Sequence, residues 1–426
     1  MRFFIHTLGC KINQYESQAV REAWIARKMT ESADIREADV VLTHTCAVTA
    51  GAVADSRGAV RRAGREAPGA RIVVAGCAAQ IDPGAFAGLP GVVSVVPKDA
   101  KPGLVFWPDG PPGDGTPGPS AWPEFSITGF HRARAILKIQ DGCSHGCSYC
   151  IVPRARGGAV SRPYAHILAE ALRLLASGHR EIVLSGVNLG QFVFEKGDFW
   201  DMLMRLDSDL SPQWEGKARL RLSSLDPGML GEKALLALGA CRLVCPHLHL
   251  SLQSADAGVL FAMGRTHYTP QGVLGFLDAL RRLWPVTALG ADILTGFPGE
   301  SESAFQATFD FMGRAGLTYA HVFPYSRRPG TAAAKRTDQT PRPLRKERAA
   351  RLREAAARLE RGFAARLARL PGLTMAVERR LPGTGVCEYY AEVRLEGSSP
   401  VPPGGLLEVR PVGALDFAVL AKPASL

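Results

Sequence analysis

The sequence predicts an α/β protein built from more than one domain. The chain has 426 residues, which is too long for one ordinary domain. Strand-like and helix-like segments alternate over the first hundred residues and again, from Ala133, over nearly two hundred more. Strands separated by helices imply parallel pairing, because a parallel crossover needs about a dozen residues or more. Beyond Pro371 the pattern changes to short apolar runs broken by Gly and Pro.

The first part of the chain, residues 1–107, predicts a parallel α/β domain. Its strand-like segments are RFFIHTLG, ADVVLTHT and RIVVAG, and helical runs over residues 13–29 and 47–65 separate them. The segment PDGPPGDGTPGPSAWP, residues 108–123, is rich in Pro and Gly and predicts a linker.

The middle of the chain, residues 124–370, predicts a curved parallel sheet. Six segments are typical of strands, namely ARAILKIQ, EIVLSGVN, RLRLSSLD, HLHLSLQS, VTALGADILTGF and YAHVFPYS. Helical runs over residues 164–177, 269–283 and 302–315 lie between them. Six βα units are fewer than the eight of a full barrel, so we expect a partial barrel. A long Ala- and Arg-rich helix over residues 344–370 ends this domain.

The last segment, residues 371–426, predicts a small β-barrel of about five strands, a fold that often binds nucleic acids. The net charge of +11 also favours a polyanionic partner, although high solubility alone is an alternative. The terminal segment itself has five basic and six acidic residues. Between Arg342 and Arg369 the chain has ten Lys or Arg against three Glu, so the long helix is the better RNA-binding candidate. A solvated helix face is the alternative.

The composition favours a cytoplasmic protein that does not enter a membrane. No stretch approaches the roughly 20 apolar residues that a membrane span needs, and the N-terminus lacks the apolar core of a signal peptide. The nine cysteines of a chain in a reducing compartment are expected to bind metal or to be buried.

Cys143, Cys147 and Cys150 follow the first strand of the central domain with the spacing Cys-x3-Cys-x2-Cys. A tight loop of this kind lets three thiolates face one centre. Three ligands leave one iron of a cubane cluster open to a substrate, whereas a closed zinc site takes four. The spacing therefore predicts a 4Fe–4S cluster that cleaves S-adenosylmethionine (SAM), with a zinc site completed by His145 or a distant histidine as the alternative.

A second set of cysteines, Cys10, Cys46 and Cys77, is dispersed in the sequence, yet each follows a predicted strand directly. If these strands are parallel, their carboxyl ends share one edge of the sheet, where open α/β sheets bind ligands. This placement predicts a second three-cysteine cluster. Three buried structural cysteines are the alternative.

Several motifs around these cysteines resemble the radical SAM superfamily: GVN, SLQS, MGRTHYT and DILTGFPGE. The resemblance implies that the strand ends grip the methionine and adenosine parts of SAM. The SAM-binding candidates are Gly186, Asn188, Gln253, Ser254, Arg265 and Phe297. For the glycines in these motifs, an ordinary role in turns is the alternative.

Two three-cysteine sites, one of them preceding a radical SAM domain, make the whole chain similar to the methylthiotransferase family, in which the C-terminal barrel is of the TRAM type. The opening LGCKINQYES, with Lys11 and residues 13–17, is similar to the branch that acts on threonylcarbamoyladenosine in tRNA. The resemblance implies two 4Fe–4S clusters and two SAM molecules per turnover. One SAM methylates sulfur at the N-terminal cluster, and the other gives a 5′-deoxyadenosyl radical that takes hydrogen from C2 of the adenine. The implied partners are the tRNA anticodon loop and a flavodoxin- or ferredoxin-like reductant protein.

Some positions depart from the family pattern or have no assigned role. His44 stands where the family usually has Asn, and the segment PRARGGAVSRP keeps Arg156, Gly157 and Arg162 but lacks an Arg-Ser-Arg run. The residues without an assigned site are Cys241, Cys245, Cys387, His247 and His249, the last two expected to face the interior of the partial barrel. The open alternatives are an isopentenyladenosine substrate, a ribosomal-protein aspartate, or a noncatalytic RNA-binding iron–sulfur protein.

Overall fold

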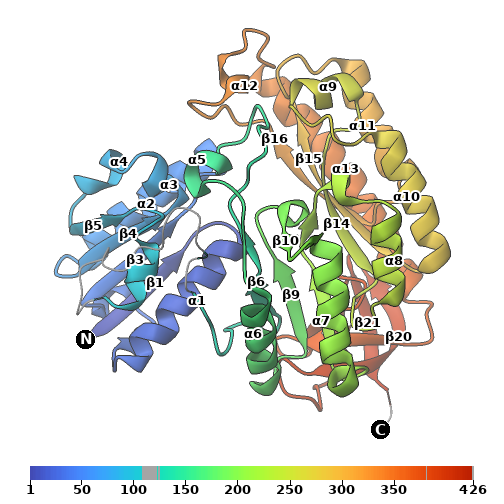
Figure 1. Cartoon of the computed structure of the whole chain (residues 1–426), viewed down its shortest axis with the longest axis horizontal. Coiled ribbons are helices and arrows are strands. Elements are labelled where there is room, and N and C mark those ends of the chain that lie inside the picture. Colours follow the sequence, from blue (N-terminus) through green and yellow to red (C-terminus); the bar gives the residue numbers. More distant parts are fainter. Residues whose placement is uncertain (108–121, 123–124, 380, 425–426) are drawn as a thin grey trace. The chain divides into compact units, whose positions relative to one another are not determined.

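The computed structural model describes residues 1–107, 122, 125–379 and 381–424 (Figure 1). The predicted linker at 108–123 lies outside the described residues, except for Trp122. The chain divides into two compact units. Unit 1 comprises residues 1–128, 138–163 and 326–334, and unit 2 comprises residues 129–137, 164–325 and 335–426.

Unit 1 contains a five-stranded sheet in the order β2-β1-β3-β4-β5, and every neighbouring pair is parallel. Its strands are β1 (Arg2–Thr7), β2 (Thr30–Glu31), β3 (Val40–Thr45), β4 (Arg71–Gly76) and β5 (Val92–Val96). The residues of β3 are all buried, as expected for a parallel strand that is covered on both faces. The parallel α/β fold predicted for this part of the chain is therefore confirmed.

Unit 1 has four helices between the strands of this sheet in sequence. They are α1 (Lys11–Ala26), α2 (Ala50–Glu66), α3 (Cys77–Ile81) and α4 (Gly84–Ala87), with 3-10 turns at Ile35–Glu37 and Lys101–Val105. The Thr49 hydroxyl caps α2 by accepting a hydrogen bond from the Ala52 N–H at 3.0 Å. Unit 1 also contains β7 (Gln140–Asp141), α5 (Val152–Arg156) and β8 (Val160–Ser161), and β7 pairs antiparallel with β8.

Unit 2 contains the strands of the predicted partial barrel. One sheet has the order β12-β9-β6 and the other the order β13-β14-β15-β16. The strands are β6 (Ala135–Lys138, whose last residue falls in unit 1), β9 (Glu181–Ser185), β12 (Arg219–Leu222), β13 (Ser224–Leu225), β14 (His247–Gln253), β15 (Ala288–Thr295) and β16 (Tyr319–Pro324). Pairing is parallel between β9 and β12 and throughout the sheet from β13 to β16.

Helices lie between these strands in sequence (Figure 1). They are α6 (Tyr164–Ala176), α7 (Phe199–Trp214), α8 (Glu232–Ala240), α9 (Ala257–Ala262), α10 (Pro270–Leu283) and α11 (Glu302–Arg314). Short elements complete the list: 3-10 turns at Leu189–Gln191 and Pro227–Met229, and the hairpin β10 (Val193–Phe194) with β11 (Gly197–Asp198). The short helix α12 (Ala332–Lys335) falls in unit 1 except for its last residue.

The end of unit 2 is a long helix, α13 (Arg342–Leu367), followed by a closed five-stranded barrel. The barrel strands are β17 (Leu373–Val377), β18 (Thr384–Cys387), β19 (Glu392–Leu395), β20 (Leu406–Leu415) and β21 (Ala418–Pro423). Phe363 and Leu367 of α13 join one apolar core with Met375 and Val419 of the barrel. The predicted terminal barrel is confirmed. Among the described residues, no helix combines the length and the apolarity needed to cross a bilayer.

Candidate functional site

The cysteines at positions 10, 46 and 77 lie at one edge of the parallel sheet in unit 1. The strands β1, β3 and β4 are neighbours, and their last pairs are Thr7 with His44 and Thr45 with Gly76. Cys10 is the N-cap of α1, Cys46 follows β3, and Cys77 is the first residue of α3. The fold thus brings together three thiols that are far apart in sequence.

Two glycines create the space and the backbone turns that these cysteines need. Gly9 has φ +95°, and a Cβ there would lie 2.9 Å from the sulfur of Cys46. Gly76 has φ +99°, and a Cβ there would lie 2.5 Å from the carbonyl oxygen of Thr45. Both conformations lie in the left-handed region that favours glycine, so a larger residue at either position would displace the thiols.

The three thiols influence one another electrostatically. Burial raises the pKa of Cys46 above its ordinary value, and negative charge on Cys10 and Cys77 raises it further. Burial also raises the pKa of Cys77, whereas the cations Arg156 and Lys101 lower it. The raised pKa values favour the protonated thiols in the absence of metal, and metal binding would deprotonate them. Three converging thiolates are the donor set of a cluster with one open iron.

The Cys143–Cys150 loop also belongs to unit 1, and its three cysteines are partly buried. The Cys143 N–H donates to the Gly157 carbonyl and the Cys150 N–H to the Cys147 carbonyl, both at 3.0 Å. Gly142 has φ +67°, and a Cβ there would lie 1.9 Å from the carbonyl oxygen of Gly158. The loop is therefore tightly folded against the segment that follows it, and its thiols suit a three-ligand cluster.

The six predicted SAM-binding residues lie in unit 2 around the carboxyl ends of its strands. Gly186 and Asn188 follow β9, and the Asn188 side chain caps the next turn by accepting from the Gly190 N–H at 3.1 Å. Gln253 ends β14 with φ +65°, an uncommon conformation for a residue other than glycine.

The other candidates are more deeply buried. Ser254 and Phe297 are 1% and 0% exposed, so their side chains serve packing and local hydrogen bonds. The Ser254 hydroxyl, for example, accepts from the Asp256 N–H at 3.1 Å. Arg265 is 5% exposed and donates to Asp226 at 3.0 Å and to the Ser251 carbonyl at 2.8 Å.

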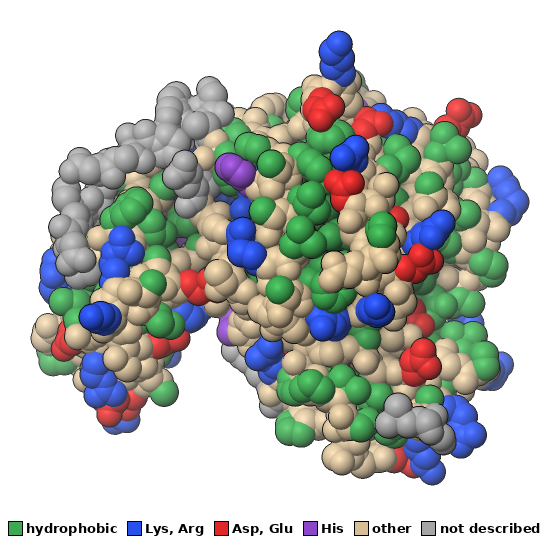
Figure 2. Space-filling model, turned by 60° about the horizontal axis from the view of Figure 1, so that its bottom comes forward, with side chains coloured by type: hydrophobic (Ala, Val, Ile, Leu, Met, Phe, Trp, Pro, Cys, Tyr) green, Lys and Arg blue, Asp and Glu red, His purple; other side chains and the backbone are tan. Residues whose placement is uncertain are grey.

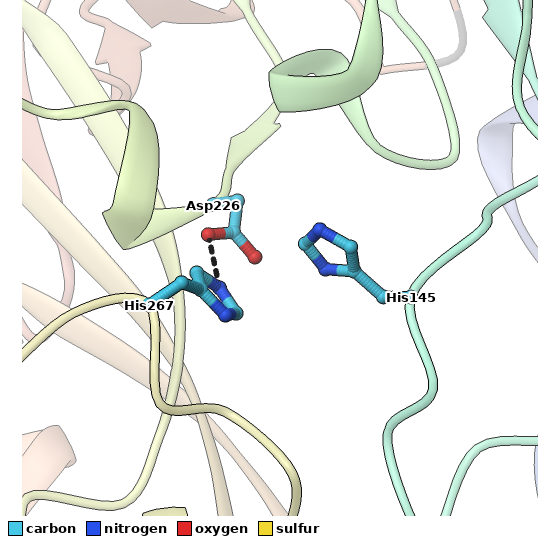
Figure 3. A group of neighbouring side chains, drawn as sticks. All are labelled: His145, Asp226 and His267. Atoms are coloured by element: carbon cyan, nitrogen blue, oxygen red, sulfur yellow. Dashed lines mark hydrogen bonds and ion pairs between the residues drawn. The ribbon is translucent and has the colours of Figure 1, made fainter.

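Sequence reasoning missed Asp226, which organises this region. It follows β13, accepts from Arg265, and lies 2.8 Å from the His267 ring nitrogen Nε2 (Figure 3). Its carboxylate also caps the next turn by accepting from the Gly228 N–H at 2.8 Å. Its position directly after a strand, like that of the cysteines, was the available signal.

The two histidines expected inside the partial barrel both reach the hydroxyl of Tyr319, His247 at 2.7 Å and His249 at 2.9 Å. His249, Asp292 and His321 also place one ligand atom each within 4.8 Å of one another. The sequence did not predict this group, because its members come from three strands. Asp292 already contacts the ring nitrogens of His249, at 3.0 Å, and of His321, at 3.2 Å.

The basic helix α13 uses several of its arginines within unit 2. Arg348 is 3% exposed and pairs with the carboxylate of Glu300 at 2.8 Å. Arg345 and Arg353 donate to backbone carbonyls at 2.5 and 2.9 Å. On the face drawn in Figure 2, the described Lys and Arg side chains are scattered and form no continuous basic patch. Other cations of the helix, such as Lys346, are exposed, so the RNA-binding role of α13 stays a prediction.

Comparisons with known proteins agree with this architecture. Residues 2–96 match the uncharacterized protein family UPF0004, and residues 137–312 match the Radical SAM superfamily. The chain is 34% identical over 413 residues to a threonylcarbamoyladenosine tRNA methylthiotransferase of Chlamydia pneumoniae, covering 96% of this chain and 94% of that protein. It is also 33% identical to a tRNA-2-methylthio-N(6)-dimethylallyladenosine synthase of Sphingopyxis alaskensis, covering 82% and 81%.

Among solved structures, the radical S-adenosylmethionine methyltransferase TsrM of Kitasatospora setae shares the fold. The TM-score is 0.58 at 16% identity, over 78% of this chain and 75% of that chain. At this identity the match supports the architecture alone.

Proposed function

Because the chain belongs to the radical SAM methylthiotransferase family, we propose that it transfers a methylthio group to C2 of N6-threonylcarbamoyladenosine beside the anticodon of tRNA. The observation that supports the proposal is that unit 1 holds two sets of three cysteines, one at the sheet edge and one in the Cys143–Cys150 loop. The relatives from Chlamydia pneumoniae, Bacillus subtilis, Rickettsia prowazekii and Aquifex aeolicus named for this substrate support the choice of base.

In this proposal each cysteine set holds one 4Fe–4S cluster. Cys143, Cys147 and Cys150 form the catalytic set, and Cys10, Cys46 and Cys77 form the auxiliary set. The chemistry that such a cluster supplies with SAM is one-electron cleavage to a 5′-deoxyadenosyl radical. Radical chemistry suits C2 of adenine, since this aromatic C–H has no acidity that a general base could use.

The residues of unit 2 would then bind and orient SAM. Gly186 and Gln253 lie at strand ends, whereas Arg265, held by Asp226, offers a fixed positive charge for a carboxylate. The His267 ring contacts the other carboxylate oxygen of Asp226 at 2.8 Å (Figure 3). The roles of Asn188, Ser254 and Phe297 would be to shape the strand ends.

We further propose that the chain consists of an N-terminal cluster domain (1–107), a linker (108–123), a radical SAM domain (124–370) and a TRAM-type barrel (371–426). We also propose a flavodoxin- or ferredoxin-like electron donor and a cytoplasmic location without membrane contact.

The proposed substrate suits this chemistry. An anticodon-loop nucleotide can leave its stack at low energetic cost, which radical attack on a base requires.

Anaerobic reconstitution tests the enzymatic proposal against a noncatalytic iron–sulfur protein. Reconstituted protein with SAM and dithionite should release 5′-deoxyadenosine, and the variant with Cys143, Cys147 and Cys150 replaced by Ala should not. Absence of 5′-deoxyadenosine from the native protein would refute radical SAM chemistry.

The second candidate function is methylthiolation of the dimethylallyl base, which the Sphingopyxis alaskensis relative favours. Mass analysis of tRNA nucleosides from a deletion strain separates the two. We expect loss of the methylthio-threonylcarbamoyl nucleoside alone. If that nucleoside persists and the methylthio-dimethylallyl one disappears, the second candidate is correct.

A further inference from the structure

A buried charge network in unit 1 lies beside the auxiliary cysteines. Its centre is Glu16, which is 1% exposed and salt-bridged to Lys101 at 2.5 Å and Lys138 at 2.8 Å. Asp141, 3% exposed, accepts from Lys138 at 2.7 Å and from Arg156 at 2.9 Å. Arg156 also reaches Glu16 at 3.1 Å, which closes the network.

This network connects the two cysteine sites. Glu16 lies on α1, the helix that begins after Cys10, whereas Asp141 and Arg156 flank the loop of Cys143–Cys150. A hydrogen bond of 2.6 Å from Arg156 to the Asn13 side chain ties the same two segments together. Asn13 in turn donates to the Leu8 and Thr45 carbonyls at 2.8 and 3.0 Å, next to the auxiliary cysteines.

The charges in this salt-bridged set do not balance. Three cations, Lys101, Lys138 and Arg156, share two carboxylates, Glu16 and Asp141, which leaves one positive charge.

The surplus charge acts on the auxiliary cysteines. Arg156 interacts electrostatically with the thiols of Cys77 and Cys10, and Lys101 with that of Cys77. Water does not screen these interactions well, since Lys101 and Arg156 are only 4% and 3% exposed. Three thiolates carry more negative charge than a 4Fe–4S core carries positive charge, so the occupied site is anionic and becomes more so on reduction.

We propose that this buried network tunes the auxiliary cluster electrostatically, with its surplus positive charge favouring the reduced, more anionic state. Net charge is one of the factors that set the potential of an iron–sulfur centre. The residues of the network are positioning residues in this proposal. Glu16 of the opening motif LGCKINQYES belongs to the network and Asn13 contacts it, which gives these two residues a physical role. The proposal rests on the proposed function, because it requires a cluster on Cys10, Cys46 and Cys77.

The test is an EPR-monitored redox titration of the full-length chain with Cys143, Cys147 and Cys150 replaced by Ala, which leaves only the auxiliary cluster. Lys101→Met removes a cation and should shift the midpoint potential to more negative values. Glu16→Gln removes an anion and should shift it the other way. The double variant keeps the net charge and should return close to the parent, whereas Lys28→Met, an exposed lysine of the same unit, should not shift it.

Opposite shifts support the proposal, because a merely structural network would move both single variants in the same direction. Shifts of the same sign, or no shift, would overturn it. If Lys101→Met fails to hold the cluster, iron content decides: recovery in the double variant supports charge balance, and continued loss overturns it. A parent chain that takes up no iron would instead contradict the proposed function.

Discussion

Glu181→Gln tests how unit 2 holds its terminal barrel. Glu181 is 0% exposed and accepts from Arg219 at 2.7 Å and from Arg221 at 2.6 Å. The same arginines donate onward to barrel carbonyls, Arg219 to Thr374 at 2.6 Å and Arg221 to Cys387 at 2.9 Å. Removing one partner of a buried ion pair costs about 3–5 kcal/mol, because the other charge stays buried. Glutamine keeps one carbonyl acceptor, so we expect the lower end, about 3 kcal/mol.

Hydrogen exchange measures this cost directly in the barrel. A loss of about 3 kcal/mol corresponds to roughly a hundredfold faster exchange for the protected amides of β17 and β18, if they exchange when the barrel opens. Glu354→Gln is the matched control, since that carboxylate is 72% exposed and pairs with Arg358 on the helix surface. Equal exchange in the two variants would refute the view that Glu181 anchors the barrel.

The same contact predicts a pH dependence. Burial raises the pKa of Glu181, but Arg221 and Arg219 lower it more, so it lies below its ordinary value. A carboxyl with a lowered pKa in the folded state stabilises the fold above its unfolded pKa, and this contribution is lost as the pH falls through the folded pKa. Barrel protection in the native protein should therefore fall in acid, whereas Glu181→Gln should remove this part of the dependence.

Three further predictions concern the cysteines and their surroundings. Gly142→Ala should lower the iron content by about half, through loss of the radical cluster alone, and Gly76→Ala should lower it similarly through loss of the auxiliary cluster. The reason is that an added Cβ would overlap a backbone carbonyl in each case. Iron analysis with EPR distinguishes the two variants, and equal loss of both clusters in either variant would contradict the view that each glycine affects only its own site. Asp226→Asn should weaken SAM binding by about tenfold in calorimetry, since it removes the charge that holds Arg265. Unchanged affinity would show that Asp226 does not position Arg265 for SAM. Burial raises the pKa of Cys241 to about 12, so its alkylation by iodoacetamide should accelerate about tenfold per pH unit between pH 8 and 11, and a plateau near pH 9 would refute the shift.

The fold was predictable wherever local periodicity and burial agree. The helix expected over residues 164–177 is α6 (Tyr164–Ala176), and the strand expected in HLHLSLQS is β14 (His247–Gln253). The barrel strand β18 (Thr384–Cys387) carries only a weak sequence signal, because TGVC is short and contains a Gly. Local patterns therefore predict long elements better than short ones.

The buried network was not predictable from the sequence, because its contacts are non-local. Arg156 lies 140 residues from Glu16, and Lys101 lies 85 residues from it. The sequence marked residues 13–17 as a subfamily motif without indicating what they touch. Three parallel strands could place the cysteines on one edge by rule, but no such rule connects a helix to a loop far along the chain.

The unusual His44 illustrates how a departure from a family pattern can leave a site intact. Its Nδ1 lies 3.0 Å from the Ser17 hydroxyl, and its Nε2 lies 3.2 Å from a Glu16 oxygen, so the ring reaches α1. Cys46, two residues further on, is held separately, because its N–H donates to the Ser56 hydroxyl at 3.1 Å. The substitution therefore alters the buried network rather than the cysteine position, and its effect should appear in the potential of the auxiliary cluster before it appears in cluster loading.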